Sequence, residues 1–210
     1  MGYFKNSIGP HLVDAICGLS LTNVNRAKTV SKARGRVLEI GMGGARNMQF
    51  YDYANIEKLW GLEPNHTMRR KAARRVRGLP FEFEFLDLPG EEIPLEDDSV
   101  DTVVSTCTLC AIPGVEEALT QIRRVLKPNG RFLFMEHGES PDADVRKWQD
   151  RLNPVFVWSS CHINRPIRKL ITGGGFEICE LDADYVPISR NWPSIFKITS
   201  FGYLGSARIR

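Results

Sequence analysis

Hydrophobic and polar positions follow two patterns along this chain. Short runs of consecutive apolar residues predict buried strands, and longer stretches with apolar residues three or four positions apart predict helices. The runs predict strands at 36–40, 58–63, 81–86, 100–105 and 131–136, with strand-like segments at 176–181 and 201–209. The helical stretches are 45–54, 65–77, 114–126, 142–158 and 165–172. Because strands and helices alternate, we expect an α/β fold with a mostly parallel, seven-stranded sheet and helices on both faces.

Three segments add to this alternation. Residues 10–30 carry a helical apolar pattern before the first strand, which predicts a helical N-terminal cap over 1–34. The last two strands have no crossover helix of the usual length between them, which predicts an antiparallel last strand. The helical segments within 138–172 predict a substrate cap over the carboxyl ends of the strands. The length of 210 residues fits one domain over 1–210.

A glycine turn follows the first strand. Residues 37–45 read VLEIGMGGA, a short apolar strand that enters a turn at Gly41 and Gly43. Such a turn brings backbone N–H groups close to a polar ligand. Glu63 ends the next strand and lies 20 residues after Gly43, the spacing at which an acidic residue meets a ribose in βαβ nucleotide folds. The segment therefore predicts a nucleoside-containing cofactor.

The residues around this turn disfavour a dinucleotide. A dinucleotide fingerprint needs a third glycine where this chain has Arg46. Glu39, two residues before the first glycine, would repel a pyrophosphate but would tolerate the ammonium group of an amino acid. S-adenosylmethionine (SAM) carries such an amino acid end, so the turn favours SAM over NAD.

Composition and charge exclude several classes of protein. Hydrophobic residues make up 42% of the chain and the net charge is +3, which is ordinary for a globular domain. The one basic cluster lies on a predicted helix and consists of Arg69, Arg70, Lys71, Arg74, Arg75 and Arg77. It lacks interleaved aromatic residues for stacking on single-stranded nucleic acid, so we expect no nucleic-acid partner. A solvated helix face is the simplest interpretation, and transient contact with an acidic membrane surface stays open.

The chain has no apolar run of 18 residues and no signal-peptide pattern before Pro10, so we expect a cytoplasmic protein. Its cysteines, five in number, are scattered and are expected to be free thiols. Cys107 and Cys110 have C-x-x-C spacing, but a zinc site would need further ligands. Cys161 and His162 do not supply a convincing second pair, so the sequence predicts no metal site.

Taken together, these motifs resemble those of class I SAM-dependent methyltransferases over nearly the full length. EIGMG at 39–43 resembles the glycine motif of that family, and Glu63 resembles the acid that binds both ribose hydroxyls. GEEIPL at 90–95, followed by SVD at 99–101, resembles the adenine-side loop, and LKPNGR at 126–131 resembles the turn before the fifth strand. The resemblance implies a Rossmann-like fold with SAM as cofactor and S-adenosyl-L-homocysteine as product. Ala45 is a departure, because the family usually has its third glycine there.

A narrower resemblance covers the second half. TCTLC at 106–110, FMEH at 134–137, WQDRLNP at 148–154 and CHINR at 161–165 resemble the thiol S-methyltransferase (methyltransferase-like) group and its small bacterial relatives. Animal members of that group carry an N-terminal membrane anchor, which we do not expect in this protein. The resemblance implies methyl transfer (EC 2.1.1.-) to a small, rather apolar acceptor, with a thiol favoured. Methylation of a lipid or quinone precursor and a SAM-binding protein without catalysis are the alternatives; the sequence assigns no oligomeric state.

The resemblance and the element pattern together give a candidate site. The expected cofactor-binding residues are Glu39, Gly41, Gly43, Asn47, Glu63, Pro64, Met68, Gly90, Glu91, Thr106 and Cys107. Substrate contacts are expected from Glu136, Trp148 and Arg165, although the simpler interpretation of the last two is that they pack the cap or tie it down. A thiol has a pKa near 8.5 and needs little base catalysis. His137 and His162 are the candidate catalytic residues, as general bases for an amine or enolic acceptor.

Overall fold

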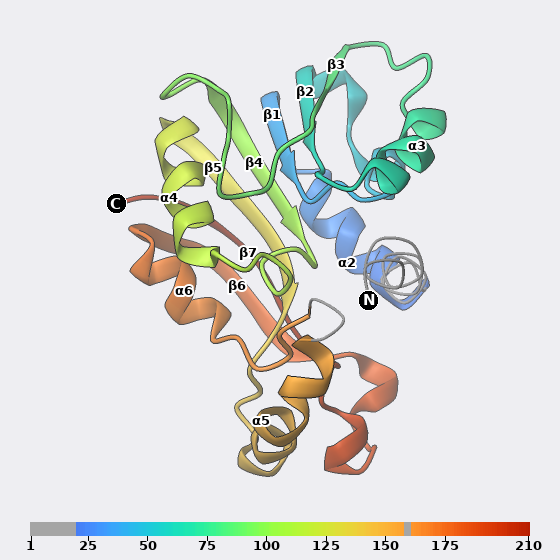
Figure 1. Ribbon diagram of the computed structural model, residues 1–210, viewed down its shortest axis with the longest axis vertical. Coiled ribbons are helices and arrows are strands. Elements are labelled where there is room, and N and C mark those ends of the chain that lie inside the picture. Colours follow the sequence, from blue (N-terminus) through green and yellow to red (C-terminus); the bar gives the residue numbers. More distant parts are fainter. Residues whose placement is uncertain (1–19, 158–160) are drawn as a thin grey trace.

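The computed structural model describes residues 20–157 and 161–210, which form a seven-stranded sheet with helices on both faces (Figure 1). The strands are β1 (Gly35–Ile40), β2 (Ile56–Leu62), β3 (Glu82–Leu86), β4 (Val100–Thr106), β5 (Leu126–His137), β6 (Phe176–Tyr185) and β7 (Phe201–Ile209). Their order in the sheet is β3-β2-β1-β4-β5-β7-β6. Strands β1 to β5 pair in parallel, and β7 is antiparallel to both of its neighbours, as the sequence predicts.

The helices are α2 (Ser20–Val30), α3 (His66–Arg75), α4 (Val115–Val125), α5 (Ala143–Val157) and α6 (Ile167–Gly173). Figure 1 shows α4 and α6 on one side of the sheet and α2 and α3 on the other. Helix α5 lies beyond the carboxyl end of β5, beside the short turns η4 (Pro187–Ser189) and η5 (Ser194–Phe196). The carboxyl ends of the parallel strands therefore point toward the half of the molecule that contains α5.

Two apolar cores explain why the central strands read as continuous hydrophobic runs. In β1, Leu38 and Ile40 pack into the core that includes the α4 side chains, while Val37 faces the core that includes Val30 of α2 and Ala72 of α3. Successive side chains of a strand point to opposite faces, so a sheet covered on both faces needs apolar residues at both.

The predicted helix at 45–54 is wrong. The chain instead forms two short 3₁₀ turns, η2 (Met48–Phe50) and η3 (Tyr53–Asn55). Ala45 has a φ of 58°, in the left-handed region, so a right-handed α-helix cannot begin there. Asp52 then starts the second turn separately, because its side chain accepts a hydrogen bond from the Ala54 N–H.

Other predicted boundaries need smaller changes. The turn predicted at 127–130 is a bulge inside β5, since the register with β4 passes from Val100–Leu126 to Thr102–Arg131. Residues 10–19 of the predicted N-terminal helix, and residue 158 of the predicted cap helix, lie outside the described residues. Within the two described ranges, we find no helix that is both long enough and apolar enough to cross a membrane.

Candidate cofactor and acceptor site

The glycine turn after β1 is built from left-handed residues. Gly41 and Gly43 have φ values of 61° and 56°, and Ala45 adopts the same conformation. A Cβ atom on Gly41 would lie 2.3 Å from Cγ2 of Thr108, so the turn packs directly on the loop after β4. A Cβ atom on Gly43 would meet nothing closer than 3.9 Å. The turn thus keeps its shape despite Ala45, and its Gly43 side is open to a ligand.

The Glu63 carboxylate lies beside this turn, just past the carboxyl end of β2. One oxygen accepts a hydrogen bond from the Gly43 N–H (2.9 Å) and the other from the Asn65 N–H (2.8 Å). Burial raises the pKa of Glu63, and the two backbone N–H groups oppose that shift. Each carboxylate oxygen retains a further lone pair for a hydroxyl donor. This arrangement fits the hydroxyl pair of a ribose.

The other residues expected on the adenosine side lie in two places. Pro64 and Met68 lie at the start of α3, and Gly90 and Glu91 lie in the loop after β3. Pro64 is exposed before α3, and Met68 is buried in its first turn. Gly90 is buried, since a Cβ atom there would lie 2.8 Å from Cδ1 of Ile112. The Glu91 carboxylate accepts a hydrogen bond from the Gly114 N–H (2.9 Å), so it holds the start of α4. The backbone at Gly90 stays the predicted contact for the adenine.

Two members of the basic cluster brace this end of the sheet. Arg69 donates to the Glu63 carbonyl (2.5 Å) and to the Asp87 carboxylate (2.6 Å). Arg75 donates to the Gly44 carbonyl inside the glycine turn. These guanidinium groups hold the cofactor end of the fold, which the interpretation as a solvated helix face did not anticipate.

Glu39 supports the turn from inside the protein. Its carboxylate is buried and accepts hydrogen bonds from the Tyr51 hydroxyl (2.7 Å) and the Asn47 amide (3.0 Å). Burial is the largest influence and raises the pKa of Glu39 to about 7, against the lowering effects of Tyr51, Arg26 and Asn47. Of the two roles expected for Glu39, bracing the turn is the one that its contacts support.

An arginine from the N-terminal helix joins this network. Arg26 of α2 is 4% exposed and donates to the Asn47 side-chain oxygen (2.5 Å) and the Thr106 hydroxyl (3.0 Å). Asn47 also donates to the Thr106 hydroxyl (3.0 Å). Asn47 and Thr106 are thus brought together as expected of site residues. Sequence reasoning missed Arg26 and Tyr51, because only the tertiary fold brings them to Glu39.

The loop after β4 is fixed by a buried carboxylate. Glu136 accepts hydrogen bonds from the Ser105 hydroxyl (2.6 Å) and the Thr108 N–H (2.9 Å), and burial raises its pKa. The Thr108 hydroxyl in turn donates to the Ile40 carbonyl (3.2 Å). Glu136, expected at the substrate, therefore positions the loop in this structure. Between Ser105 and Thr108, Cys107 has a φ of 53°, the kind of strained backbone that is common at functional sites.

Three side chains meet beyond this loop: Cys110, His137 at the end of β5, and Cys161 of the cap. Their sulfur and nitrogen atoms all lie within 4.8 Å of one another, and Cys161 Sγ is 3.3 Å from His137 Nε2. A hydrogen bond from Cys110 holds the pKa of the Cys161 thiol below its usual range, and the same contact raises that of Cys110. Sequence reasoning found no convincing ligand pair in Cys161 and its neighbour His162; the fold brings Cys161 to His137.

His162 and Arg165 tie the cap to the loop after β4. The His162 N–H donates to the Cys110 carbonyl (2.8 Å), and burial lowers the pKa of its half-buried ring. Arg165, largely buried, donates to the Leu109 carbonyl. Trp148 is half-buried on α5, and the Arg151 guanidinium lies 5.7 Å from the centre of its ring. This contact of Trp148 lies within the cap.

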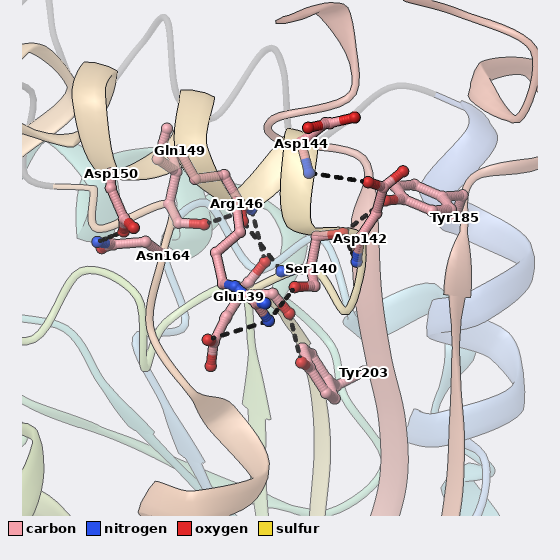
Figure 2. Close-up of polar contacts among 12 residues, drawn as sticks. Glu139, Ser140, Asp142, Asp144, Arg146, Gln149, Asp150, Asn164, Tyr185 and Tyr203 are labelled. Carbon is pink, nitrogen blue, oxygen red and sulfur yellow. Dashed lines mark hydrogen bonds and ion pairs between the residues drawn. The ribbon is translucent and has the colours of Figure 1, made fainter. Parts of the chain in front are cut away.

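Gln149 locks the cap onto the sheet. Its amide nitrogen donates to the carbonyls of Gly138 (2.9 Å), Ile163 (2.9 Å) and Ile198 (3.0 Å), and its oxygen accepts from the Ser140 N–H (2.9 Å). Figure 2 shows the surrounding contacts, in which Ser140 meets Tyr185, Asp150 meets Asn164, and Tyr203 reaches the Glu139 backbone. The cap is therefore held by buried polar contacts from several segments.

Known proteins resemble this chain in sequence and in fold. Residues 38–134 match the family described as Methyltransferase domain. Thiol S-methyltransferase TMT1B of Rattus norvegicus is 31% identical over 163 residues, which is 74% of this chain and 65% of that protein. The Homo sapiens protein of the same name is 30% identical over 173 residues, 78% of this chain and 70% of its own length. The chain belongs to the SAM-dependent methyltransferases.

Two further comparisons show which other proteins this methyltransferase resembles. It spans about two thirds of the length of the thiol S-methyltransferases that it matches. Ubiquinone/menaquinone biosynthesis C-methyltransferase UbiE of Brucella anthropi is 37% identical, but over 97 residues, 46% of this chain and 34% of that protein. A chain in the complex of the Haloferax volcanii Trm112 methyltransferase activator with a methyltransferase covers 98% of this chain, and 96% of its own, at a TM-score of 0.68 and 16% identity. The last likeness supports the fold alone.

Proposed function

We propose that this methyltransferase transfers a methyl group from SAM to a small, rather apolar acceptor, and that the acceptor is a thiol. The observation that carries the first part is the Glu63 carboxylate held beside the open Gly43 side of the glycine turn. The turn and the carboxylate lie at the carboxyl ends of β1 and β2, where open α/β sheets bind their ligands.

The residues of the cradle would divide the work of holding SAM. Glu63 would accept charge-assisted hydrogen bonds from the ribose hydroxyls, while backbone groups of Gly41 and Gly43 approach the ligand closely. The backbone at Gly90 and the side chain of Met68 would face the adenosine. When bound, SAM supplies a methyl group on a positively charged sulfur, which an acceptor takes by in-line displacement.

The acceptor side of the site suits a nucleophile that carries negative charge. The largely buried Arg165 guanidinium lies at the loop after β4, and a cation nearby favours the anionic form of an acceptor. A thiol already has a useful thiolate fraction near neutral pH, so alignment and exclusion of water matter more than a strong base. The names of the relatives that match most of this chain support the same acceptor class.

Methylation of a quinone precursor or a lipid is the second candidate. The similarity to UbiE favours it at 37% identity, although that similarity covers under half of this chain. An enolic carbon would need a defined base, for which His137 and His162 are the candidates.

Binding and turnover test the proposal separately. Isothermal titration should detect SAM and S-adenosyl-L-homocysteine in the micromolar range or tighter. A panel of alkyl thiols, quinols and phospholipids, followed by S-adenosyl-L-homocysteine release, should give turnover with the thiols and much less at limiting SAM with a Glu63→Gln control. Turnover with quinols or lipids alone would favour the second candidate, and cofactor binding without any turnover would indicate a non-catalytic SAM-binding protein. A folded protein that binds neither cofactor form would contradict every one of these functions.

A further inference from the structure

The cluster of Cys110, His137 and Cys161 has the composition of a zinc site. Zinc favours thiolate and imidazole ligands, and its catalytic sites in proteins have three protein ligands with a fourth position left open. In a tetrahedral site with Zn–S of about 2.3 Å and Zn–N of about 2.0 Å, neighbouring ligand atoms lie about 3.5–3.8 Å apart. The three atoms here lie within 4.8 Å of one another, with Cys161 Sγ and His137 Nε2 at 3.3 Å. Small side-chain rotations would bring them to the distances that zinc requires.

Each ligand stands on a fixed piece of backbone. His137 ends β5 and pairs with Gly202 of β7 in the sheet. The Cys110 carbonyl accepts the His162 N–H, which joins the two cysteine-bearing segments through their backbones, and the Cys161 N–H donates to the Phe156 carbonyl (3.2 Å). Ligands held by the scaffold in this way bind a metal with little reorganisation.

Exposure and charge also fit a site with one open position. Cys110 is 3% exposed, whereas His137 and Cys161 are half-buried, so the cluster is closed behind Cys110 and accessible on the other side. Two thiolates and a neutral imidazole balance the charge of one Zn²⁺. A neutral complex is compatible with this partly buried position.

The cluster and the cofactor turn share one short loop. Thr108 contacts the glycine turn through the Ile40 carbonyl, and Cys110 follows two residues later. A molecule bound at the open side of the cluster would therefore lie beside the same loop that packs on the cofactor cradle.

We propose that Cys110, His137 and Cys161 bind one Zn²⁺ whose open fourth position takes the acceptor thiol. The identity of that fourth ligand rests on the proposed function, whereas zinc binding does not. On binding, the S–H bond of the acceptor breaks, its sulfur forms a bond to Zn²⁺, and the proton passes to solvent. A zinc-bound thiol is held as the thiolate, which is the form that accepts a methyl group.

Metal binding is tested on the reduced full-length protein after removal of metal by a chelator. Titration with Zn²⁺ against a chromophoric chelator should give about one ion per chain, and Co²⁺ should give thiolate-to-metal charge-transfer absorption. The variants C110S and C161S should lose the bound zinc, while C179S should retain it, because Cys179 is exposed on β6. S-adenosyl-L-homocysteine binding by C110S and C161S checks that they fold.

The outcomes separate this proposal from the proposed function. Reduced wild-type protein that binds neither Zn²⁺ nor Co²⁺ overturns the zinc site, even if it methylates thiols, and so does zinc retained by both C110S and C161S. If the reduced protein binds no zinc and the oxidised protein forms a Cys110–Cys161 disulfide, the zinc site is likewise overturned. Addition of a small alkyl thiol to the Co²⁺ form should increase the charge-transfer absorption, because a third thiolate joins two; an unchanged spectrum overturns the open position.

Discussion

At the scale of single residues, Glu63 is the side chain on which cofactor binding depends most. Glu63→Gln keeps the shape but removes the charge, and a hydrogen bond to a charged group contributes about 1.5–3 kcal/mol. We expect S-adenosyl-L-homocysteine affinity to fall by about 10- to 100-fold, measured by titration calorimetry.

Glu57→Gln is a matched control for this prediction. Glu57 is exposed near the opposite end of the same strand, β2, and far from the glycine turn along the strand. The Glu57→Gln protein should bind S-adenosyl-L-homocysteine with the same affinity as the wild type. Equal affinity in the Glu63→Gln protein as well, with an unchanged thermal midpoint, would contradict the role assigned to Glu63.

Residues also show where sequence reasoning succeeds. Gly41, Gly43 and Glu63 are recognisable because a left-handed turn and an acid after the next strand form a local pattern with fixed spacing. Thr108, Arg26 and Tyr51 carry no such pattern. Each acts by contacting a residue more than ten positions away, so nothing local distinguishes them from ordinary polar residues.

At the scale of elements, the cap helix α5 depends on Gln149. Gln149→Leu preserves the approximate size but leaves buried carbonyl groups of Gly138, Ile163 and Ile198 without this donor. An unsatisfied buried polar group costs about 1–3 kcal/mol, so we expect the free energy of unfolding to fall by about 2–4 kcal/mol in denaturant titration. Hydrogen exchange should accelerate first in 138–164.

The exposed Gln49 provides the control for the cap. Gln49→Leu should change the free energy of unfolding by less than about 0.5 kcal/mol. If Gln149→Leu behaves like Gln49→Leu, or if hydrogen exchange rises evenly over the whole sheet, then Gln149 is not the residue that locks the cap.

Elements were predicted unevenly, and the reason is physical. All seven strands were expected; the central ones are the clearest, because their apolar runs fill two cores at once. The helix expected at 45–54 is absent because the backbone at Ala45 is left-handed. The turn imposes this conformation, and an alanine in the sequence does not indicate it. The bulge in β5 was predicted as a turn, because Pro128 and Gly130 are typical both of turns and of bulges.

At the scale of the whole molecule, the buried Glu39 makes stability depend on pH. Burial raises its folded pKa to about 7 from an ordinary value of 4.5, so the folded state binds its proton more tightly than the unfolded state. The stabilising contribution is fully present below about pH 4.5 and is lost as pH rises through about 7, a change of about 3 kcal/mol. The polar groups that face Glu39 are Arg26 of α2, together with Asn47 and Tyr51 of the segment after the glycine turn.

Glu39→Gln isolates this effect, because glutamine resembles the protonated acid and does not titrate. The difference in free energy of unfolding between Glu39→Gln and the wild type should shift in favour of the variant by about 2.5 kcal/mol between pH 5 and pH 8, measured by denaturant titration. Other titrating groups cancel in this difference. A difference that stays constant over this range would show that Glu39 does not hold its proton in the folded protein.

The sequence by itself determined the α/β architecture, the parallel strands with an antiparallel last strand, and the cofactor cradle, since each depends on local periodicity or on a short, fixed spacing. The tertiary structure alone decided which distant side chains meet. The Glu136 carboxylate contacts Ser105 and Thr108 of the loop after β4, and Cys161 meets His137 and Cys110. Such meetings depend on how the cap folds back over the ends of the strands, and no local pattern in the chain encodes that path.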